Sequence, residues 1–162
     1  MQLQTSLTLE AARQIIAVAL ATARAEAMLP MTVVVLDAGG RIVASQSEDG
    51  SGLLRFDVAR GKAWGALGMG MSSRLIRDRL ESRPSFQAAL GVAADGKFIP
   101  VPGGVLVKLP DGTVIGAVGI SGDTSEKDEF CAIKAIHASD LACEPDTPDA
   151  SWRNSTLSGP TH

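Results

Sequence analysis

The segment from residue 100 to residue 128 constrains the fold most strongly, because strand-forming and turn-forming residues alternate along it. Residues 105–109 and 113–120 are rich in β-branched side chains, which suit a pleated sheet. Asp111-Gly112 separates them, and this dipeptide is a strong signal for a β-hairpin turn. Thr124 then has the chemistry of a helix N-cap. The segment therefore predicts an antiparallel hairpin that leads directly into a helix.

Two corners of small residues flank this hairpin. Pro102-Gly103-Gly104 precedes it, where proline cannot continue a helix and glycine permits backbone angles closed to other residues. Ser121-Gly122 follows it, where a hydroxyl would lie near helix-terminal N–H groups that can hold an anion. An ordinary turn serine is the alternative. We expect both corners to be exposed and to form a rim that can bind a ligand, although nothing in them specifies a reaction.

A second hairpin and several helices account for the rest of the chain. Residues 31–36 form a continuous apolar run, typical of a strand buried on both faces, and residues 41–47 return after the turn Asp37-Ala38-Gly39-Gly40. Apolar residues at helical spacing predict helices over residues 8–28, 53–71 and 124–143, with shorter helical segments at 72–81 and 84–90. Two antiparallel hairpins separated by helices predict an α/β (α+β) sandwich built around an antiparallel sheet.

Composition excludes several classes of protein. At 162 residues the chain is most simply one domain, and its 45% of apolar residues excludes global disorder. The net charge of −3 argues against nucleic acid as a partner. No apolar run is long enough to span a bilayer, and the first residues lack the pattern of a signal peptide. We therefore expect a cytoplasmic protein without a membrane partner.

The composition changes at Glu144, after which the chain is polar and contains prolines. We expect a folded domain over residues 1–143 and a tail over residues 144–162 that is loose or packs on a partner subunit. Trp152 offers this tail an anchor on the body or on a partner.

Histidines and cysteines are few in this chain. His137 and His162 are its histidines, neither lies in an HExxH motif, and no CxxC pair occurs, so no metal centre is predicted. His137 falls in the C-terminal half of the last expected helix, where a cation is favourable. It is either a structural or solvated histidine or a heme ligand. Cys131 and Cys143 are expected to be reduced thiols in a cytoplasmic chain.

Charged side chains offer a second kind of candidate site. Lys62 lies between two small residues, so its amine can lie against a packed surface and pair with a carboxylate or bind an anionic ligand. A plain surface lysine is the alternative. Arg55 shares a helical face with Lys62 at 3.6 residues per turn. A turn-forming role accounts for Asp37, and the helix dipole accounts for Glu126 and Asp128.

Five motifs together resemble the GlcG/HbpS-like family, which is also called heme-degrading-domain-like and includes the C-terminal domain of PduO. They are VVVLDAGGRIVA at 33–44, DG at 49–50, ARGKAWGAL at 59–67, PVPGGV at 100–105 and GAVGISGDTSEKDEF at 116–130. The resemblance runs from about residue 7 to residue 137, and the motifs keep their order and spacing.

The resemblance implies a profilin-like sandwich with a central antiparallel sheet of about five strands, and a homo-oligomer. Some members bind heme or related tetrapyrroles, and some belong to operons for the use of small acids or glycols. Carried over by position, the recurrent polar set of the family falls on Asp37, Asp49, Lys62, Ser121, Glu126 and Asp128, and its glycine corner on Pro102, Gly103 and Gly104. No histidine near the N-terminus matches the axial ligand of PduO-type domains, so heme would need His137, a methionine such as Met69 or Met71, or another ligand.

Three functions follow as hypotheses. The first is an oligomeric binding protein that holds a tetrapyrrole such as heme or a small anionic metabolite, with Asp49, Arg55, Ser121, Glu126 and the glycine corner as ligand-binding residues. The second is a small cofactor-independent isomerase, lyase or hydrolase of a catabolic pathway, in which Lys62 acts with Asp128 or Asp37 as acid and base. The third is a structural role in assembly.

Overall fold

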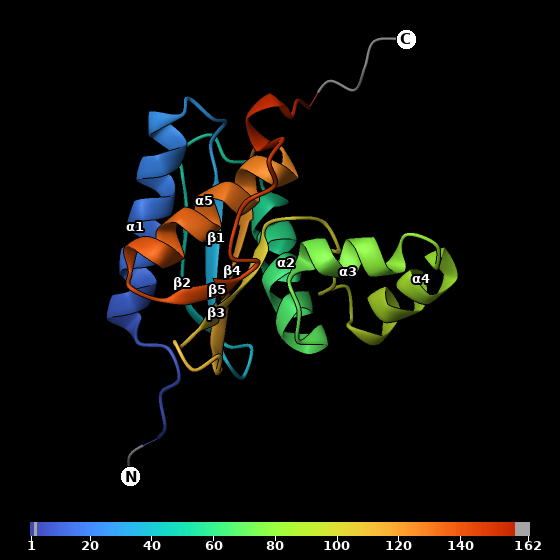
Figure 1. Cartoon of the computed structure of the whole chain (residues 1–162), viewed down its shortest axis with the longest axis horizontal. Coiled ribbons are helices and arrows are strands. Elements are labelled where there is room, and N and C mark those ends of the chain that lie inside the picture. The colour runs from blue at the N-terminus through green and yellow to red at the C-terminus, as the bar shows by residue number, and fades with distance from the viewer. Residues whose placement is uncertain (2, 158–162) are drawn as a thin grey trace.

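The computed structural model describes residue 1 and residues 3–157, which form a five-stranded antiparallel sheet covered by helices (Figure 1). The strand order is β2-β1-β4-β3-β5. The elements follow one another along the chain as α1 (Leu9–Ala25), β1 (Thr32–Asp37), β2 (Ile42–Ser47), α2 (Arg55–Met69), α3 (Ser73–Leu80), α4 (Pro84–Ala93), β3 (Gly104–Lys108), β4 (Val114–Ser121), α5 (Ser125–Ala138), β5 (Ala142–Glu144) and the short 3-10 helix η1 (Trp152–Asn154). The α+β sandwich with a central antiparallel sheet of five strands, predicted from the sequence, is confirmed.

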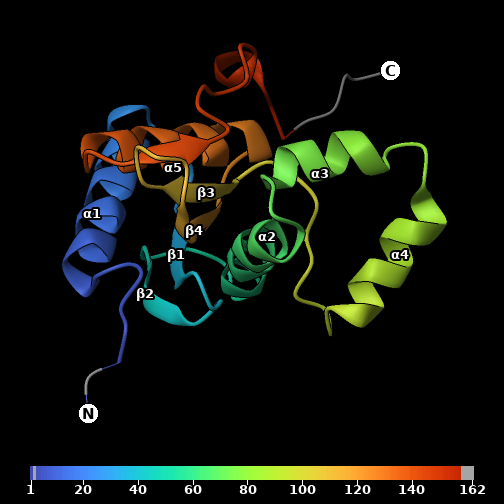
Figure 2. The ribbon, with the colours of Figure 1, turned by 60° about the horizontal axis from the view of Figure 1, so that its bottom comes forward.

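Helices cover both faces of the sheet because its central strands carry apolar side chains on both sides. Val33 and Val35 of β1 belong to the core cluster that contains α1 and α5, whereas Val34 and Leu36 pack with the alanines of α2. The views in Figure 1 and Figure 2 agree that α1 and α5 lie together on one side and α2 on the other. The continuous apolar run at 31–36 was thus correctly interpreted as a strand buried on both faces.

Helix α2 lies so close to the sheet that glycine is required beneath it. A Cβ atom on Gly119 would lie 1.9 Å from the carbonyl oxygen of Ala59, and one on Gly104 would lie 2.3 Å from that of Lys62. Both distances are far below van der Waals contact, and the neighbouring atoms belong to the helix backbone. The small residues of the second hairpin therefore set the separation of α2 from β3 and β4.

We expect Gly119→Ala to destabilise the protein by about 3 kcal/mol or more, at or above the upper end of what overpacking usually does, because α2 as a whole has to move. Gly91→Ala is the matched control, since a Cβ at Gly91 of α4 meets no described atom within 4 Å. Removing backbone freedom there should stabilise the protein by about 0.4–1 kcal/mol. Urea unfolding of both variants measures the difference, and equal midpoints would contradict this packing.

The end of the last helix differs from its prediction. We predicted a helix over 124–143, but α5 ends at Ala138 and residues 142–144 form β5 against β3. Asp140 adopts a left-handed φ of 56°, which aspartate tolerates better than most residues and which stops the helix. Pairing with β3 then satisfies the backbone groups of what would otherwise be an open sheet edge. Helical periodicity could not reveal this, because the apolar residues continue through position 143.

The segment after β5 packs on the body as far as it is described. The ring of Trp152 stacks on Phe130 of α5, with centroids 3.7 Å apart and planes 8° from parallel. Arg153 forms an ion pair of 2.8 Å with Glu26 at the end of α1. The domain boundary that we expected at residue 143 falls inside β5. Trp152 anchors the segment after β5 on the body of its own chain.

Helices α3 and α4 project from the sandwich as an arm (Figure 2). A small cluster of Ile76, Leu80, Ala94 and Phe98 holds the arm together, but none of the residues of α4 is fully buried. Within the described part of the chain, no helix combines the length and the apolar character needed to cross a membrane.

Candidate functional site

Lys62 and Asp128 meet in the interior. Lys62 Nζ lies 2.9 Å from Asp128 Oδ2 and donates a second hydrogen bond of 2.9 Å to the carbonyl of Ile120. Asp128 Oδ1 accepts the backbone N–H of Asp123 at 3.1 Å. Both side chains are only 2% exposed. The ion pair thus links α2 to the first turn of α5, on the other side of the sheet, past the end of β4.

Burial controls the charge of this pair. It raises the pKa of Asp128 from 3.8 to about 6, although the nearby Lys62 ammonium acts in the opposite direction. The backbone at Gly103 covers the lysine amine, since a Cβ at this position would lie 2.9 Å from Nζ. The φ of 117° at Gly103 also disfavours any other residue there. Lys62 and Asp128 therefore have the contact that acid–base chemistry needs but lack an open approach for a substrate.

Arg55 and Ser121 complete the polar cluster around this pair. Arg55 Nη1 donates to Ser121 Oγ at 3.2 Å. Its positive charge also lowers the pKa of Asp128, against the effect of burial. Ser121 and the Pro102-Gly103-Gly104 corner are buried. The expectation that both corners are exposed is wrong, because α2 packs directly on Gly104 and the backbone of Pro30 and Met31 packs on Gly122.

Three other predicted site residues lie apart from this cluster. In the sheet register Asp37 pairs with Gly116 and Thr32 with Ser121, so Asp37 stands at the far end of β1, roughly 17 Å away along the strand. Its Oδ1 accepts the N–H groups of Gly39 and Arg41, which is the turn-forming role. The structure therefore contradicts an acid–base pair of Lys62 with Asp37.

Asp49 and Glu126 also remain outside the cluster. Asp49 is exposed and lines an open surface recess of about 430 Å³ with Arg24, Pro30 and Glu48. Glu126 lies 3.7 Å from Arg77 of α3. The polar residues carried over from the family are thus spread over several places rather than along one rim.

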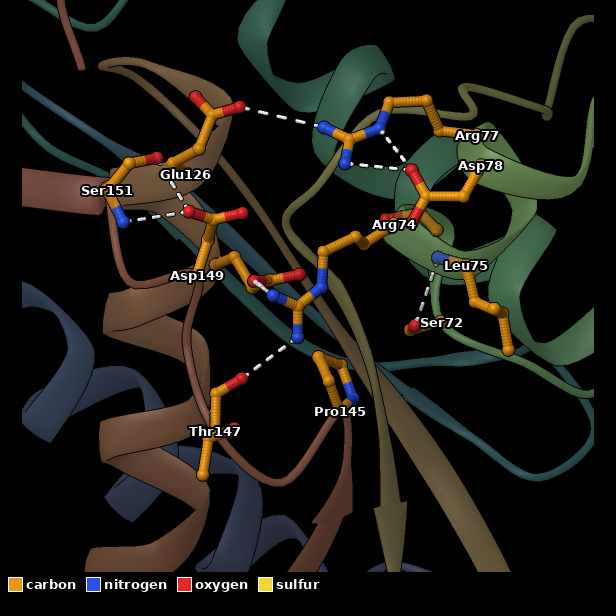
Figure 3. Close-up of polar contacts among 12 residues, drawn as sticks. Ser72, Arg74, Leu75, Arg77, Asp78, Glu126, Pro145, Thr147, Asp149 and Ser151 are labelled. Carbon is orange, nitrogen blue, oxygen red and sulfur yellow. Dashed lines mark hydrogen bonds and ion pairs between the residues drawn. The ribbon is translucent and has the colours of Figure 1, made fainter. Parts of the chain in front are cut away.

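A second polar network joins α3 to α5 and to the segment after β5 (Figure 3). Arg74 reaches between them: it donates to the carbonyl of Thr147 at 2.9 Å and lies 3.4 Å from Glu129 Oε1. Glu129 is fully buried, and neither of its carboxylate oxygens has a hydrogen-bond partner among the described residues. Burial raises its pKa from 4.5 to about 7. Sequence analysis missed Glu129, because its burial depends on α3 and the segment after β5 packing against α5.

An apolar recess of about 210 Å³ lies between α2 and α4. Its lining residues are Trp64, Gly65, Gly68, Met69, Leu90, Ala93, Ala94 and Phe98. Gly65 lets Phe98 pack closely on α2, since a Cβ there would lie 3.1 Å from the Phe98 ring. Lys97 Nζ stands 5.3 Å from the Trp64 ring centroid. The recess combines flat aromatic walls with a nearby cation and a thioether side chain.

His137 belongs to a third cluster, at the end of α5. Its Nε2 lies 3.3 Å from Cys143 Sγ and 3.2 Å from Asp146 Oδ1. Phe130, Ile133 and neighbouring residues form an adjoining recess of about 300 Å³. Sequence analysis missed this cluster, because a continuous helix through residue 143 would have pointed His137 and Cys143 in different directions.

Comparison with known proteins identifies the family of this chain. The family model described as "Haem degrading protein HbpS-like" matches residues 7–137. An uncharacterized 15.0 kDa protein encoded between dhaT and dhaS in Citrobacter freundii is 30% identical over 131 residues, which are 81% of this chain and 90% of that protein.

Two solved structures share the fold over most of both chains. PduOC, crystallised in complex with heme, is 27% identical with a TM-score of 0.75, covering 84% of this chain and 96% of its own. The Klebsiella pneumoniae protein ORFY is 29% identical with a TM-score of 0.74, covering 86% of this chain and 94% of its own. The sequence match, the strand order and the structural likeness agree, and this chain belongs to the HbpS-like family.

Proposed function

We propose that this protein binds a tetrapyrrole such as heme. The observation that carries the proposal is the likeness to PduOC, a chain of the same fold that was crystallised with heme, over 84% of the present chain. Membership of the HbpS-like family supports the same class of ligand. The expected setting is the cytoplasm, and the expected form is a homo-oligomer.

The recess between α2 and α4 is the site that we assign to the tetrapyrrole. Trp64 and Phe98 offer flat apolar surfaces, and Gly65 and Gly68 also line the recess. Met69 lines the recess, and a methionine thioether can serve as an axial ligand to heme iron. Lys97 lies beside Trp64 with a charge that suits a propionate.

A second copy of the chain would complete this site. The recess measures about 210 Å³, less than the range of about 300–1,000 Å³ typical of ligand pockets, so part of the ring would extend beyond it. Val92 of α4 is 83% exposed and Phe86 is 40% exposed, which leaves apolar surface on the arm for a partner subunit. The oligomer would then enclose the ligand.

A heme titration of the apo-protein, followed by its Soret absorbance, tests the proposal. We expect a saturable, shifted band that Met69→Leu alters and that Met71→Leu, which changes a methionine outside the recess lining, leaves intact. His137→Ala belongs in the same series, because His137 is the other candidate iron ligand. A band lost only in His137→Ala would move the heme to the end of α5. The absence of any saturable band would overturn heme binding and leave small anionic metabolites to be screened.

The contact of Lys62 with Asp128 favours a second candidate, a cofactor-independent enzyme. In it the buried pair would exchange a proton with a substrate admitted by movement of the Gly103 corner. Catabolic small acids and glycols are the substrates to assay. Turnover that survives both Lys62→Met and Asp128→Asn would remove this assignment.

A further inference from the structure

His137, Cys143 and Asp146 place three different kinds of metal ligand in one spot. One nitrogen, one sulfur and one carboxylate oxygen lie within 4.8 Å of one another, and this is the one such group among the described residues. All three residues come from the segment 137–146: His137 from the last turn of α5, Cys143 from β5, and Asp146 from the loop that follows. Pairing of β5 with β3 fixes the position of the cysteine.

Two side chains converge on one ring nitrogen of His137. Cys143 Sγ and Asp146 Oδ1 both approach Nε2, the same nitrogen of the ring. The Cys143 thiol donates to the carbonyl of Pro145 at 3.2 Å, and Nε2 carries one hydrogen at most, so the sulfur and the carboxylate compete for the same N–H. A Cys-His-Asp catalytic relay does not fit either, because its acid would hold the other ring nitrogen.

A metal ion accounts for the convergence of the three atoms. Zinc bonds of about 2.0–2.3 Å at tetrahedral angles bring neighbouring ligand atoms to roughly 3.3–3.7 Å from one another. The two separations at His137 Nε2, 3.3 Å to sulfur and 3.2 Å to oxygen, lie close to that range. The C-terminal end of α5 is also the negative end of the helix dipole, which favours a cation.

We propose that His137, Cys143 and Asp146 bind a divalent transition-metal ion of the zinc type. The mixed nitrogen, sulfur and oxygen set suits Zn²⁺ or Co²⁺ better than Mg²⁺ or Ca²⁺, which prefer oxygen alone. Three protein ligands leave one tetrahedral position toward the recess beside Phe130 and Ile133, where solvent or an anion can bind. Lys134 lines this recess and is placed to pair with such an anion.

The site goes beyond both the family match and the heme proposal. Cys143 and Asp146 lie after residue 137, where the family model ends, so two of the three ligands lie outside the matched domain. It also lies at the opposite end of α5 from Asp128, and none of its ligands lines the recess at Trp64.

The test is titration of the reduced, chelator-stripped full chain with Co²⁺, followed by displacement with Zn²⁺. We expect one Co²⁺ per chain, with a near-ultraviolet thiolate-to-cobalt band and visible bands of tetrahedral intensity that Zn²⁺ abolishes. Even the loss of a group that only supports a metal ligand weakens binding about 10–100-fold. Cys143→Ser and His137→Ala should therefore weaken it by more than about 100-fold.

Matched controls separate this site from incidental binding. Asp146→Asn should weaken Co²⁺ binding, whereas Asp140→Asn, in the preceding exposed loop, should not. Cys131→Ala should keep the thiolate band, because Cys131 is buried against Met28. Asp146 and His137 are 80% and 43% exposed, so their variants should fold even if Cys143→Ser does not. Lack of a thiolate band in the wild type, or its persistence in Cys143→Ser or His137→Ala, would overturn the proposal.

Discussion

Lys62→Met should destabilise the protein by about 3–5 kcal/mol, the usual penalty for leaving one member of a buried ion pair without its partner. Methionine keeps most of the length of the lysine side chain, so the loss reports the charge and its hydrogen bonds rather than a cavity. Asp128, 2% exposed, would then be a buried carboxylate that retains the backbone N–H of Asp123 but loses the ammonium.

The pH dependence of this loss identifies its cause. Without Lys62 the pKa of Asp128 should rise further above its present value of about 6, because only desolvation and weaker contacts remain. At low pH the carboxyl becomes neutral and the penalty shrinks, so the loss should be larger at pH 8 than at pH 5. The double variant Lys62→Met/Asp128→Asn removes both charges and should recover much of the stability.

Urea unfolding of the wild type, both single variants and the double variant measures the coupling. Additive losses would show that the two side chains do not interact, and Lys62→Met with wild-type stability would contradict a buried pair. The same variants serve the enzyme hypothesis, since a folded double variant separates a role in stability from a role in turnover.

Glu129→Gln should stabilise the protein at pH 8 by up to about 3 kcal/mol. The folded-state pKa of Glu129, about 7, lies above its ordinary value of 4.5. Below pH 4.5 the Glu129 carboxyl is neutral in both the folded and the unfolded chain, and its burial costs no ionisation energy. As the pH rises through 7 the buried carboxyl ionises, and the protein loses the corresponding stability. A shift of this size corresponds to about 3 kcal/mol at roughly 1.4 kcal/mol per pKa unit. Glutamine has the same shape and does not titrate.

Comparing how the unfolding free energies of the wild type and of Glu129→Gln change with pH isolates the contribution of Glu129. Unfolding free energies between pH 5 and pH 8 should fall more steeply for the wild type than for Glu129→Gln, and the two curves should converge toward low pH. Glu126→Gln is the matched control: it makes the same change one turn earlier on α5, at a side chain that is 27% exposed and paired with Arg77. Parallel curves for wild type and Glu129→Gln would mean that Arg74 holds the carboxylate charged without penalty.

Much of the fold could be predicted from the sequence, because local interactions encode it. The hairpin turns, the N-cap Thr124 and the two-faced strand β1 were all identified correctly. Each depends on residues a few positions apart: a hydroxyl that accepts a nearby N–H, a glycine at a turn, or an apolar period of a helix or strand.

The candidate sites could be predicted only in part. The family motifs suggested a common place for Lys62, Ser121 and Asp128, and the structure brings these three together. Asp37 does not join them, because the antiparallel register sets it at the other end of β1. The sequence also gave no sign that the glycine corners are covered, since that depends on how closely α2 approaches the sheet.

The sequence by itself determined most of the elements, their order and the family, because these follow from short-range periodicity and from motifs read in succession. Only the tertiary structure decided which polar groups are buried and which meet. Glu129 is buried by the packing of α3 and the later segment against α5, and Cys143 reaches His137 because β5 pairs with β3. Burial and convergence of side chains depend on contacts between segments far apart in the chain, and these exist only once the sheet and its helices are assembled.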